Sequence, residues 1–356
     1  MAPEVFETMV PWLKDNFGNP HSAHKLGRQA AAIVEVAREQ VEALFPDQGD
    51  LIFTGSATEA INLGFGAVHR QMESGRNKII VLETEHAAVR DTAKSYQNMG
   101  FDVSFQPVQS SGIVALEQIA SALDNKTALI AAMLVNNEIG VVQPIEAIAE
   151  LAHSHGALMI CDAVQGYGRI PIPKGVDMVA LSGHKIYGPK GIGGLWKRND
   201  LQLPTLIHGG GQEKNVRSGT LSPALCVGLG KAAELCRQNM EHDWQHMERL
   251  QTRAQDCFDD WTINGLRDQR YPGNLNIRKN GLDVARLMSD VRDVAFSAGS
   301  ACASGSGRPS HVLTALGLKP LEVKSSIRLG FGRYTTMQEI EQAADIINRA
   351  VEAQFA

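Results

Sequence analysis

The sequence predicts an α/β fold, with a large domain built on a mainly parallel sheet and a smaller α+β domain. Through the first two thirds of the chain, short apolar runs alternate with longer helical patterns, which is typical of parallel strands joined by crossover helices. After about residue 230 this alternation gives way to one long helical pattern rich in Glu, Arg, Gln and His. At about 150 residues per domain, the length of 356 residues agrees with roughly two domains.

The expected strands of the large sheet are short apolar runs, at residues 51–54, 78–82, 128–134, 158–161, 178–181 and 194–197. Helices are expected between them at 58–71, 87–99 and 145–153, and Gly100 and Gly156 are placed to end the second and third. Beyond residue 230 we expect a helix at 231–258, strands at 274–277 and 294–297, and helices at 310–316 and 337–354. We therefore assign residues 14–238 to the large domain and residues 1–13 and 239–356 to the small one.

Charge and cysteine content exclude several classes of protein. The 34 Lys and Arg against 39 Asp and Glu give a net charge of −5, so the chain lacks the basic field that direct nucleic-acid binding needs. The first residues do not resemble a signal peptide, and the longest apolar run, 128–135, is far shorter than the roughly 20 residues of a membrane helix. We expect a cytoplasmic protein with no membrane partner.

The five cysteines are odd in number and widely spaced, with no CxxC pair that would indicate a zinc or redox site, so no metal is expected. Cys161, Cys226, Cys236 and Cys257 lie in apolar or helical stretches and are interpreted as small core residues. Cys302 instead lies in a run of small residues, 297–309. It is a candidate nucleophile, provided that its environment lowers the thiol pKa.

Polar residues follow the apolar strands, where open α/β sheets bind their ligands. Asp162 follows the run at 158–161, and it could equally be a helix N-cap or the partner of a cationic ring nitrogen. Lys185 follows the run at 178–181, together with Ser182, Gly183 and His184. Alone, Lys185 would more often be a surface lysine. Beside these three residues, Lys185 is a candidate to form a Schiff base with an aldehyde cofactor.

Three further strand ends carry weaker signals. Ala57 and Thr58 open a helix after the run at 51–54, and this helix end could bind a phosphate or simply be an ordinary Ser/Thr cap. His86 follows the run at 78–82 and could stack on an aromatic cofactor, although an isolated histidine is usually structural. Asn137 follows the run at 128–134, where asparagines are usually turn residues. Their convergence at one sheet edge favours a ligand site.

Arg328 lies inside an apolar, strand-like run at 325–329. Its guanidinium could clamp a substrate carboxylate, or it could form a structural ion pair with equal probability.

Short motifs in a fixed order connect these residues to a known family. They are Phe-Gly-Asn-Pro at 17–20, Thr-Glu-His-Ala-Ala-Val at 84–89, Val-Asn-Asn-Glu-Ile-Gly-Val-Val-Gln at 135–143, Ser-Gly-His-Lys-Ile-Tyr-Gly-Pro-Lys-Gly at 182–191, His-Gly-Gly-Gly-Gln at 208–212, Arg-Ser-Gly-Thr-Leu at 217–221 and Gly-Ser-Ala-Cys at 299–302. Together they resemble the cysteine desulfurases, pyridoxal 5′-phosphate enzymes of the class V aminotransferase fold (fold type I). The spacing from Cys302 to the helix at 310 resembles that of the longer-loop group.

The resemblance implies a role for each candidate residue. Lys185 would hold the cofactor as a Schiff base, Asp162 would pair with the ring nitrogen, and His86 would stack on the ring and move protons. Arg328 and Asn137 would bind the substrate carboxylate, and Cys302 would attack the substrate sulfur. The remaining cofactor-binding residues would be Gln165 and Asn137 near the ring oxygen, Gly183 beside Lys185, and Ala57, Thr58, Ser182, His184 and the Thr220 of a second subunit at the phosphate.

The resemblance thus implies a homodimer that converts L-cysteine to L-alanine and passes a Cys302 persulfide to an acceptor protein. The pathway would be iron–sulfur cluster assembly, tRNA thiolation or DNA phosphorothioation. A selenocysteine or cysteine sulfinate lyase on the same fold is an alternative. A catalytically impaired scaffold is another, because family members normally begin with a Thr-Thr-Pro segment, whereas this sequence opens at Met1-Ala-Pro-Glu-Val.

Overall fold

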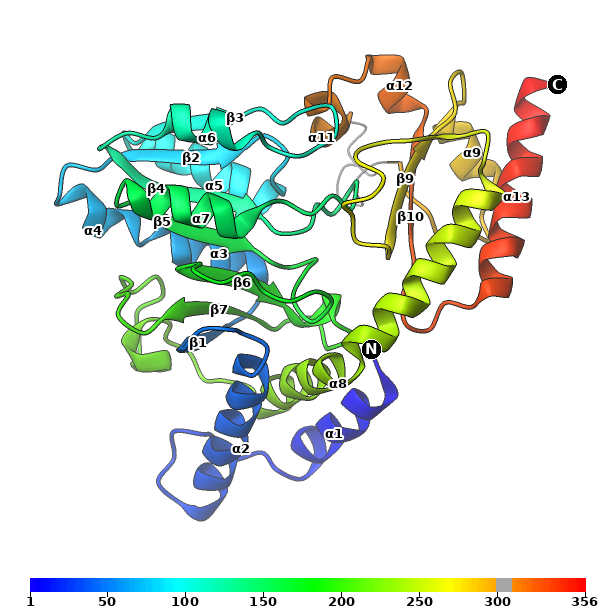
Figure 1. Ribbon diagram of the computed structural model, residues 1–356. Helices are drawn as coiled ribbons and strands as arrows, with labels where there is room; N and C mark the ends of the chain where they lie inside the picture. Colours follow the sequence, from blue (N-terminus) through cyan, green and yellow to red (C-terminus); the bar gives the residue numbers. More distant parts are fainter. Residues whose placement is uncertain (299–308) are drawn as a thin grey trace.

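The structure is a computed structural model that describes residues 1–298 and 309–356, and its largest element is a seven-stranded sheet (Figure 1). The strand order is β1-β7-β6-β5-β4-β2-β3. The strands are β1 (Gly49–Thr54), β2 (Lys78–Leu82), β3 (Asp102–Gln106), β4 (Thr127–Met133), β5 (Leu158–Asp162), β6 (Met178–Ser182) and β7 (Gly193–Arg198). Neighbouring strands from β6 to β3 are parallel, and β7 is antiparallel to both of its neighbours. The prediction of a mainly parallel sheet is confirmed.

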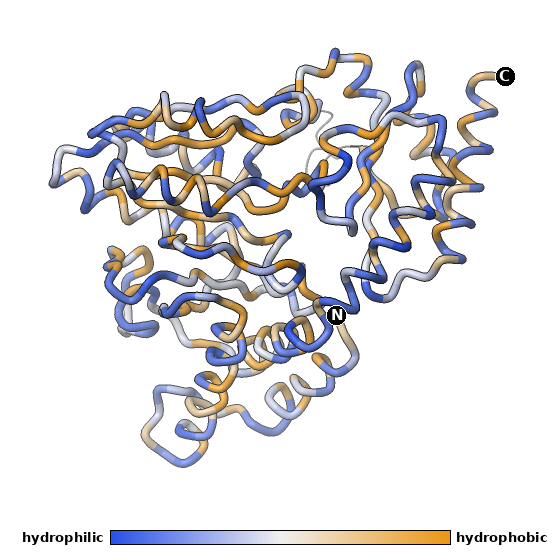
Figure 2. The backbone as a smooth tube through the Cα atoms, in the orientation of Figure 1, coloured by the Kyte–Doolittle hydropathy of each residue, from blue (hydrophilic) through white to orange (hydrophobic). Residues whose placement is uncertain are grey.

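Helices cover both faces of this sheet because its strands contribute buried apolar residues to a core on each face. Figure 2 shows the apolar residues of these strands in orange. On one face, Ile80, Ile130 and Val179 share a core with α2 (Lys25–Glu42), α7 (Ile145–Ser154) and the first part of α8 (Pro223–Cys257). On the other face, Ile79 and Leu129 share a core with α3 (Ala57–Phe65) and α5 (Ala87–Asn98). The shorter elements are α4 (Val68–Met72), α6 (Leu116–Ala122), η1 (Gly183–Lys185) and η2 (Glu213–Asn215).

Three sequence-based expectations for this region were wrong in detail. Strand β3 was not expected, because only Val103 and Phe105 in it are apolar and it lies at the sheet edge. The helix expected at 58–71 is divided into α3 and α4 near Gly66, where a Cβ would lie 2.9 Å from Pro204 Cγ. The helix expected at 231–258 begins earlier, with Ser222 as its N-cap, because its first turns are apolar and buried against the large sheet.

A second, three-stranded sheet has the order β10-β9-β8. Its strands are β8 (Thr262–Ile263), β9 (Asn274–Arg278) and β10 (Ser326–Gly330). The last turns of α8 pack on this sheet with α9 (Val284–Asp290) and α13 (Met337–Phe355) (Figure 1). The short helices α11 (His311–Ala315) and α12 (Pro320–Lys324) share a small core with Ile139 and Val141. The strand expected at 294–297 is reduced to a single bridge between Ser297 and Arg328.

The first helix, α1 (Pro3–Lys14), packs on α8, and Ala2, Val5 and Met9 belong to the core shared with the large sheet. The domain boundaries given above stay a prediction.

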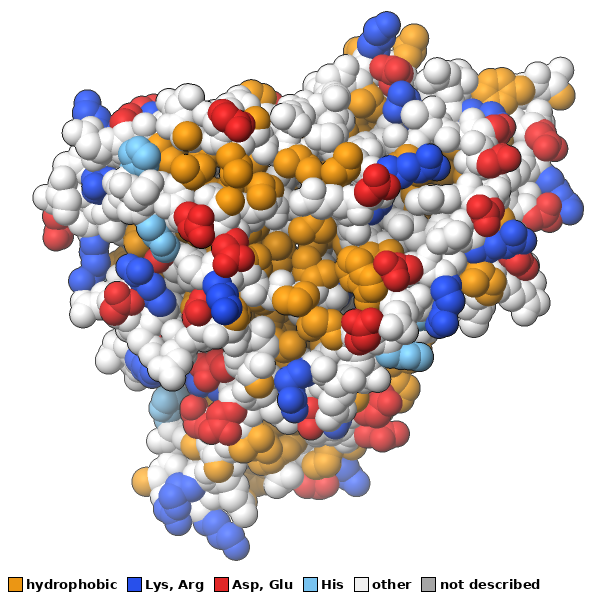
Figure 3. Space-filling model, in the orientation of Figure 1, with side chains coloured by type: hydrophobic (Ala, Val, Ile, Leu, Met, Phe, Trp, Pro, Cys, Tyr) orange, Lys and Arg blue, Asp and Glu red, His pale blue; other side chains and the backbone are white. Residues whose placement is uncertain are grey.

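In the described residues, no helix combines the length and apolar character needed to cross a membrane. The face shown in Figure 3 carries acidic and basic side chains interspersed with one another rather than gathered by sign.

Candidate active site

One cavity of about 250 Å³ lies where the carboxyl ends of the large-sheet strands face the second sheet. Strand β7 is antiparallel to both β1 and β6, so β1 runs in the same direction as β2, β4, β5 and β6. The carboxyl ends of these five strands therefore lie at one edge of the sheet. The expected site residues that line the cavity are Ala57, Thr58, His86, Asn137, Asp162, Gln165, Ser182, His184, Lys185 and Arg328. The structure therefore brings together side chains that lie as much as 271 positions apart, from 57 to 328.

One end of the cavity is the N-terminus of α3. Ser56 caps this helix, its Oγ accepting the Glu59 N–H at 3.2 Å. The N–H groups of Ala57 and Thr58 lie in the first turn, which has no preceding helical carbonyl to bind them. A Cβ on Gly193 of β7 would lie 2.7 Å from the Ser56 carbonyl carbon and 2.9 Å from the Ala57 nitrogen. Glycine at this position therefore lets the positive end of the helix approach the sheet.

Ser182 and His184 border the same end of the cavity. Ser182 is the last residue of β6, and its Oγ lies 2.9 Å from His184 Nδ1. Burial, together with the charges of Lys185 and Lys190, lowers the pKa of His184 below its usual value, so the imidazole is neutral at pH 7. The helix end, the hydroxyl and this imidazole form a set of donors suited to an oxyanion.

Asp162 lies deeper, as the last residue of β5, and only 6 % of its surface is exposed. One carboxylate oxygen accepts the Val164 N–H at 3.0 Å, so Asp162 ends a strand rather than capping a helix. Burial raises the pKa of Asp162, and the nearby charges of His86 and Lys185 act in the opposite direction. A cationic group in the cavity would hold this carboxylate ionised.

Glu85 is a second buried carboxyl group, and the sequence analysis did not single it out. Its side chain is fully buried, with Oε1 accepting the Met133 N–H at 2.7 Å, and among the described residues Oε2 has no hydrogen-bond partner. Burial and the charge of Asp162 raise the pKa of Glu85 well above its usual value. Burial thus favours the neutral form of Glu85, whereas the charges of His86 and Lys185 favour the ionised form of Asp162.

His86 is the N-cap of α5, and its Nδ1 accepts the Ala88 N–H at 3.1 Å. This bond places the proton of a neutral imidazole on Nε2. The local backbone thus selects the tautomer and fixes the ring at the cavity wall.

Lys185 ends the short helix η1 that follows β6. A Cβ on Gly183 would lie 3.0 Å from both Ile192 Cγ2 and the Pro189 carbonyl oxygen, so this turn is closely packed. Tyr187 adopts a φ of 63°, and its hydroxyl oxygen accepts the Arg333 N–H at 2.8 Å. This contact compensates for the unfavourable backbone conformation that follows the lysine.

Arg328 reaches the cavity from β10 of the second sheet. Its Nη1 donates to the Asn137 carbonyl oxygen at 2.8 Å, and Asn274 Nδ2 donates to the same oxygen at 3.2 Å. A larger space of about 400 Å³ adjoins the cavity, and its lining includes Asn137, Gln165, Arg169, Lys185 and Arg328. Arg328 therefore places a cation at the passage between the two spaces.

Two of the expected site residues that the structure describes lie outside the cavity lining. Gly183 is buried at the start of η1, and Thr220 is exposed on the segment after η2. Cys302 lies outside the described residues. Within the described part of the chain, no group of three or more His, Cys, Asp or Glu side chains could hold a metal.

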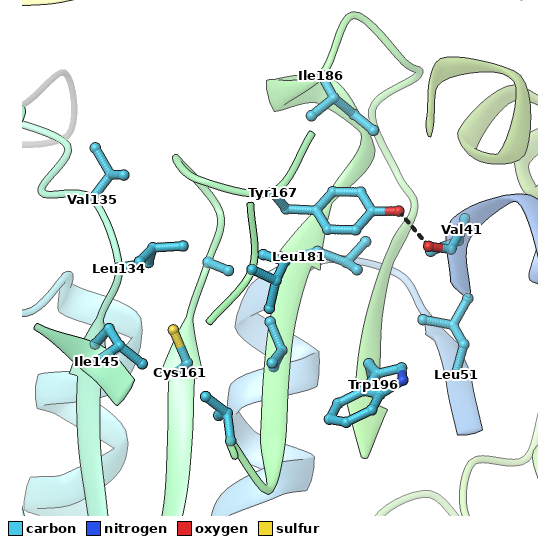
Figure 4. Packing of buried hydrophobic residues seen from close by; sticks show 14 of the residues in the cluster. Val41, Leu51, Leu134, Val135, Ile145, Cys161, Tyr167, Leu181, Ile186 and Trp196 are labelled. Atoms are coloured by element: carbon cyan, nitrogen blue, oxygen red, sulfur yellow. Dashed lines mark hydrogen bonds between the residues drawn. The ribbon is translucent and has the colours of Figure 1, made fainter. Parts of the chain in front are cut away.

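The four cysteines within the described ranges are free thiols. Cys161, Cys226 and Cys236 are buried, and Figure 4 shows Cys161 in the same apolar layer as Leu134 and Ile145. Burial raises the pKa of Cys226 to about 12 and that of Cys161 well above its usual value. Cys257 is half-buried. The interpretation of Cys161, Cys226 and Cys236 as core residues is confirmed.

This combination of fold and site is that of a known class. The family model for aminotransferase class V matches residues 1–343, and the chain belongs to this family. The cysteine desulfurase IscS of Rickettsia akari (strain Hartford) is 41% identical over 358 residues, covering 98% of this chain and 87% of the relative. A solved structure described as a NifS-like protein superimposes with a TM-score of 0.92 at 30% identity, covering 100% of this chain and 97% of that one. Another solved structure, described as SspA in complex with cysteine, superimposes with a TM-score of 0.83 at 33% identity, covering 94% of this chain and 97% of that one.

Proposed function

We propose that this protein is a cysteine desulfurase that uses pyridoxal 5′-phosphate. One observation carries the proposal: Lys185, Asp162 and Arg328 converge on one cavity whose far end is the N-terminus of α3. An amine, a buried carboxylate, a carboxylate-binding cation and an oxyanion site are the four groups that this chemistry requires. The similarity to cysteine desulfurases over nearly the whole chain supports the same function.

The residues present fit the cofactor. Gly193 has no Cβ to hold α3 away from β7, so the first N–H groups of α3 lie at the cavity, where they suit a phosphate. Asp162 is buried with a raised pKa, and a protonated ring nitrogen would hold it ionised. Ser182 and His184 would bind the phosphate with Ala57 and Thr58, whereas Gln165 and Asn137 would lie near the ring oxygen.

When bound, the cofactor supplies an electron sink for the carbon next to the substrate amine. Asp162 would keep a positive charge on the ring nitrogen, and the raised pKa of Glu85 disfavours a second negative charge beside it. His86 holds its proton on Nε2 at the cavity wall, where it can stack on a ring and move a proton. Lys185 would hold the cofactor, and its amine, when free, would act as a base.

Arg328 and the side chain of Asn137 would bind the cysteine carboxylate. Support comes from the position of Arg328 between the two spaces and from the solved relative that is described in complex with cysteine. The Cys302 thiolate would then attack the substrate sulfur. The new S–S bond gives a persulfide, the C–S electron pair stays with the substrate carbon, and protonation of that carbon gives L-alanine.

A homodimer completes the proposal. Thr220 is exposed, close in sequence to Arg217, whose Nε donates to Glu59 Oε1 of α3 at 2.6 Å. A second copy would bring its own Thr220 to the phosphate end of this cavity. The sulfur acceptor would be a protein of iron–sulfur cluster assembly, tRNA thiolation or DNA phosphorothioation in the cytoplasm.

The proposal is tested by measuring the absorbance of the purified protein and the alanine formed from L-cysteine with a reductant. We expect a yellow protein that forms alanine. Lys185→Ala should abolish covalent attachment of the cofactor and alanine formation, whereas Cys302→Ser should keep the colour and lose sulfur transfer. A protein that takes up no pyridoxal 5′-phosphate would falsify the proposal. Selenocysteine and cysteine sulfinate in parallel assays separate the lyase alternatives, because those activities would survive Cys302→Ser.

A further inference from the structure

Arg169 is a half-buried arginine that joins two residues of the proposed cofactor site. Its Nη1 donates to Gln165 Oε1 at 2.7 Å, and its Nη2 donates to the Lys185 carbonyl oxygen at 2.6 Å. The guanidinium also lies over the Tyr271 ring, 5.2 Å from its centroid. One side chain thus connects Gln165, Lys185 and Tyr271, which lies just before β9 of the second sheet.

The backbone folds Arg169 back toward Gln165. After β5, the N–H groups of Gly166 and Tyr167 both donate to the Ala163 carbonyl, and the Arg169 N–H donates to the Gly166 carbonyl at 2.9 Å. Gly168 has a φ of 72°, a conformation that suits glycine. These consecutive turns place residues 165 and 169 on the same side, as in one turn of helix.

The contact with Arg169 determines which way the Gln165 amide points. A glutamine amide has one acceptor oxygen and one donor NH₂ group, whereas a guanidinium can only donate. Because Arg169 binds Oε1, the Nε2 hydrogens are left to the other side of the amide, and Gln165 lines the cavity. The site therefore offers a donor, and not an acceptor, to whatever lies beside Gln165.

We propose that Arg169 is a positioning residue: it orients the Gln165 amide and holds the Lys185 backbone, so that the cavity presents a hydrogen-bond donor to the ring oxygen of the bound cofactor. This inference rests on the proposed function, because the acceptor is a group of the cofactor. A donor and a nearby cation both stabilise an ionised ring oxygen; without Arg169 the cation is lost and nothing from residue 169 orients the Gln165 amide.

The bound chromophore reports this arrangement, because its absorbance changes as its proton dissociates. The charged and titratable groups that line the two adjoining spaces are His86, Asp162, Arg169, His184, Lys185, Tyr271 and Arg328. Arg169→Met removes one of these charges and both hydrogen bonds at once. Arg169→Lys keeps the charge but can no longer make the two bonds in one plane.

The experiment uses the holoenzyme of each variant and two readouts that do not depend on turnover. These are the pH midpoint of the chromophore absorbance and the Kd of pyridoxal 5′-phosphate for the apoprotein. The matched control is Arg76→Met. Arg76 also donates to two backbone carbonyls, those of Thr127 at 2.9 Å and His155 at 2.8 Å, and it does not line the cavity.

We expect Arg169→Met to raise the chromophore midpoint by about 1 pH unit and to weaken cofactor binding about tenfold. Arg169→Lys should fall between this variant and the wild type, and Arg76→Met should match the wild type in both readouts. In a Gln165→Ala background, Arg169→Met should add less than about half of the shift that it causes alone.

A midpoint and a Kd that stay unchanged in both Arg169 variants overturn the inference while leaving the proposed function intact. Equal shifts in Arg76→Met would overturn it as well, because the effect would then be a general loss of packing. A wild-type protein that takes up no cofactor overturns the proposed function, and this inference with it. If Arg169→Met does not fold, the same comparison is made with Arg169→Lys.

Discussion

Two buried carboxyl groups, Glu85 and Asp162, lie close enough for the charge of one to raise the pKa of the other. Glu85 accepts the Met133 N–H and is fully buried, whereas Asp162 faces the charges of His86 and Lys185. Because the pKa of Glu85 is raised well above its usual value, its neutral form is the one that the fold stabilises. A glutamine has nearly the shape of that neutral form and keeps an acceptor for Met133.

Glu85→Gln should therefore change the pH dependence of stability. A carboxyl group with a raised pKa in the folded state binds more protons there than in the unfolded state, so folding stability falls as pH rises above its unfolded pKa of about 4.5. Glu85→Gln removes this slope. Relative to the wild type, its free energy of unfolding should thus rise as the pH increases above about 4.5, as measured by urea denaturation of the apoprotein.

Glu339→Gln is the control with the opposite sign. Hydrogen bonds from Thr336 at the N-cap of α13 lower the pKa of Glu339, so its contribution is present above the unfolded pKa and is lost as pH falls through the folded pKa. This variant should lose stability relative to the wild type as pH rises. Parallel slopes in the two variants would contradict the assignment of Glu85.

At the scale of single elements, the N-terminus of α3 depends on a glycine in a neighbouring strand. Gly193 of β7 lies against the Ser56 and Ala57 backbone, where a methyl group would meet main-chain atoms at 2.7–2.9 Å. Main chain cannot rotate away as a side chain can, so a larger residue must displace the helix end from the sheet. The position of the helix end that would bind the anion therefore depends on the size of residue 193 in β7.

Gly193→Ala should weaken cofactor binding at least about tenfold and destabilise the fold by about 1–3 kcal/mol. The control is Gly64→Ala in α3. A Cβ on Gly64 would lie 2.5 Å from Ile160 Cδ1, which is the end of a flexible side chain. That variant should change thermal stability but not the Kd of pyridoxal 5′-phosphate. An unchanged Kd in Gly193→Ala would show that the helix end does not bind the phosphate.

At the scale of the whole molecule, the two sheets contribute different parts of the site. The proposed cofactor residues of the cavity come from the large sheet and its helices, whereas Arg328 comes from β10. The two parts meet where Arg328 and Asn274 both donate to the Asn137 carbonyl. Cofactor binding and substrate binding should therefore respond differently to changes in the small sheet.

Arg328→Gln should raise the KM for L-cysteine by about tenfold to a hundredfold, because a hydrogen bond to a carboxylate is lost, and should leave the Kd of the cofactor unchanged. Arg278→Gln is the control: Arg278 donates to Asn264 Oδ1 and lines neither space. Steady-state kinetics and cofactor titration measure both effects. A loss of cofactor binding in Arg328→Gln would contradict this division between the sheets.

The sequence predicted the sheet because its strands are apolar runs, and it placed Asp162, Ser182 and Lys185 at strand ends. It could not predict that Glu85 is buried, because that burial results from the packing of β2 against β4. Arg169 was missed for a related reason, since its role depends on the turns after β5 that fold it back onto Gln165. The role of Gly193 could not be predicted, because the approach of α3 to β7 is a tertiary contact.

The long helix α8 has a geometric consequence for the whole site. Its 35 residues extend over about 50 Å, with one part buried against the large sheet and the last turns against the small one. Inserting one residue between these parts would turn the small sheet by about 100° about the helix axis and advance it by about 1.5 Å. Arg328 would then leave the cavity. The number of residues in the polar middle of α8 is therefore constrained by the register between the two cores, even where the identity of each residue is not.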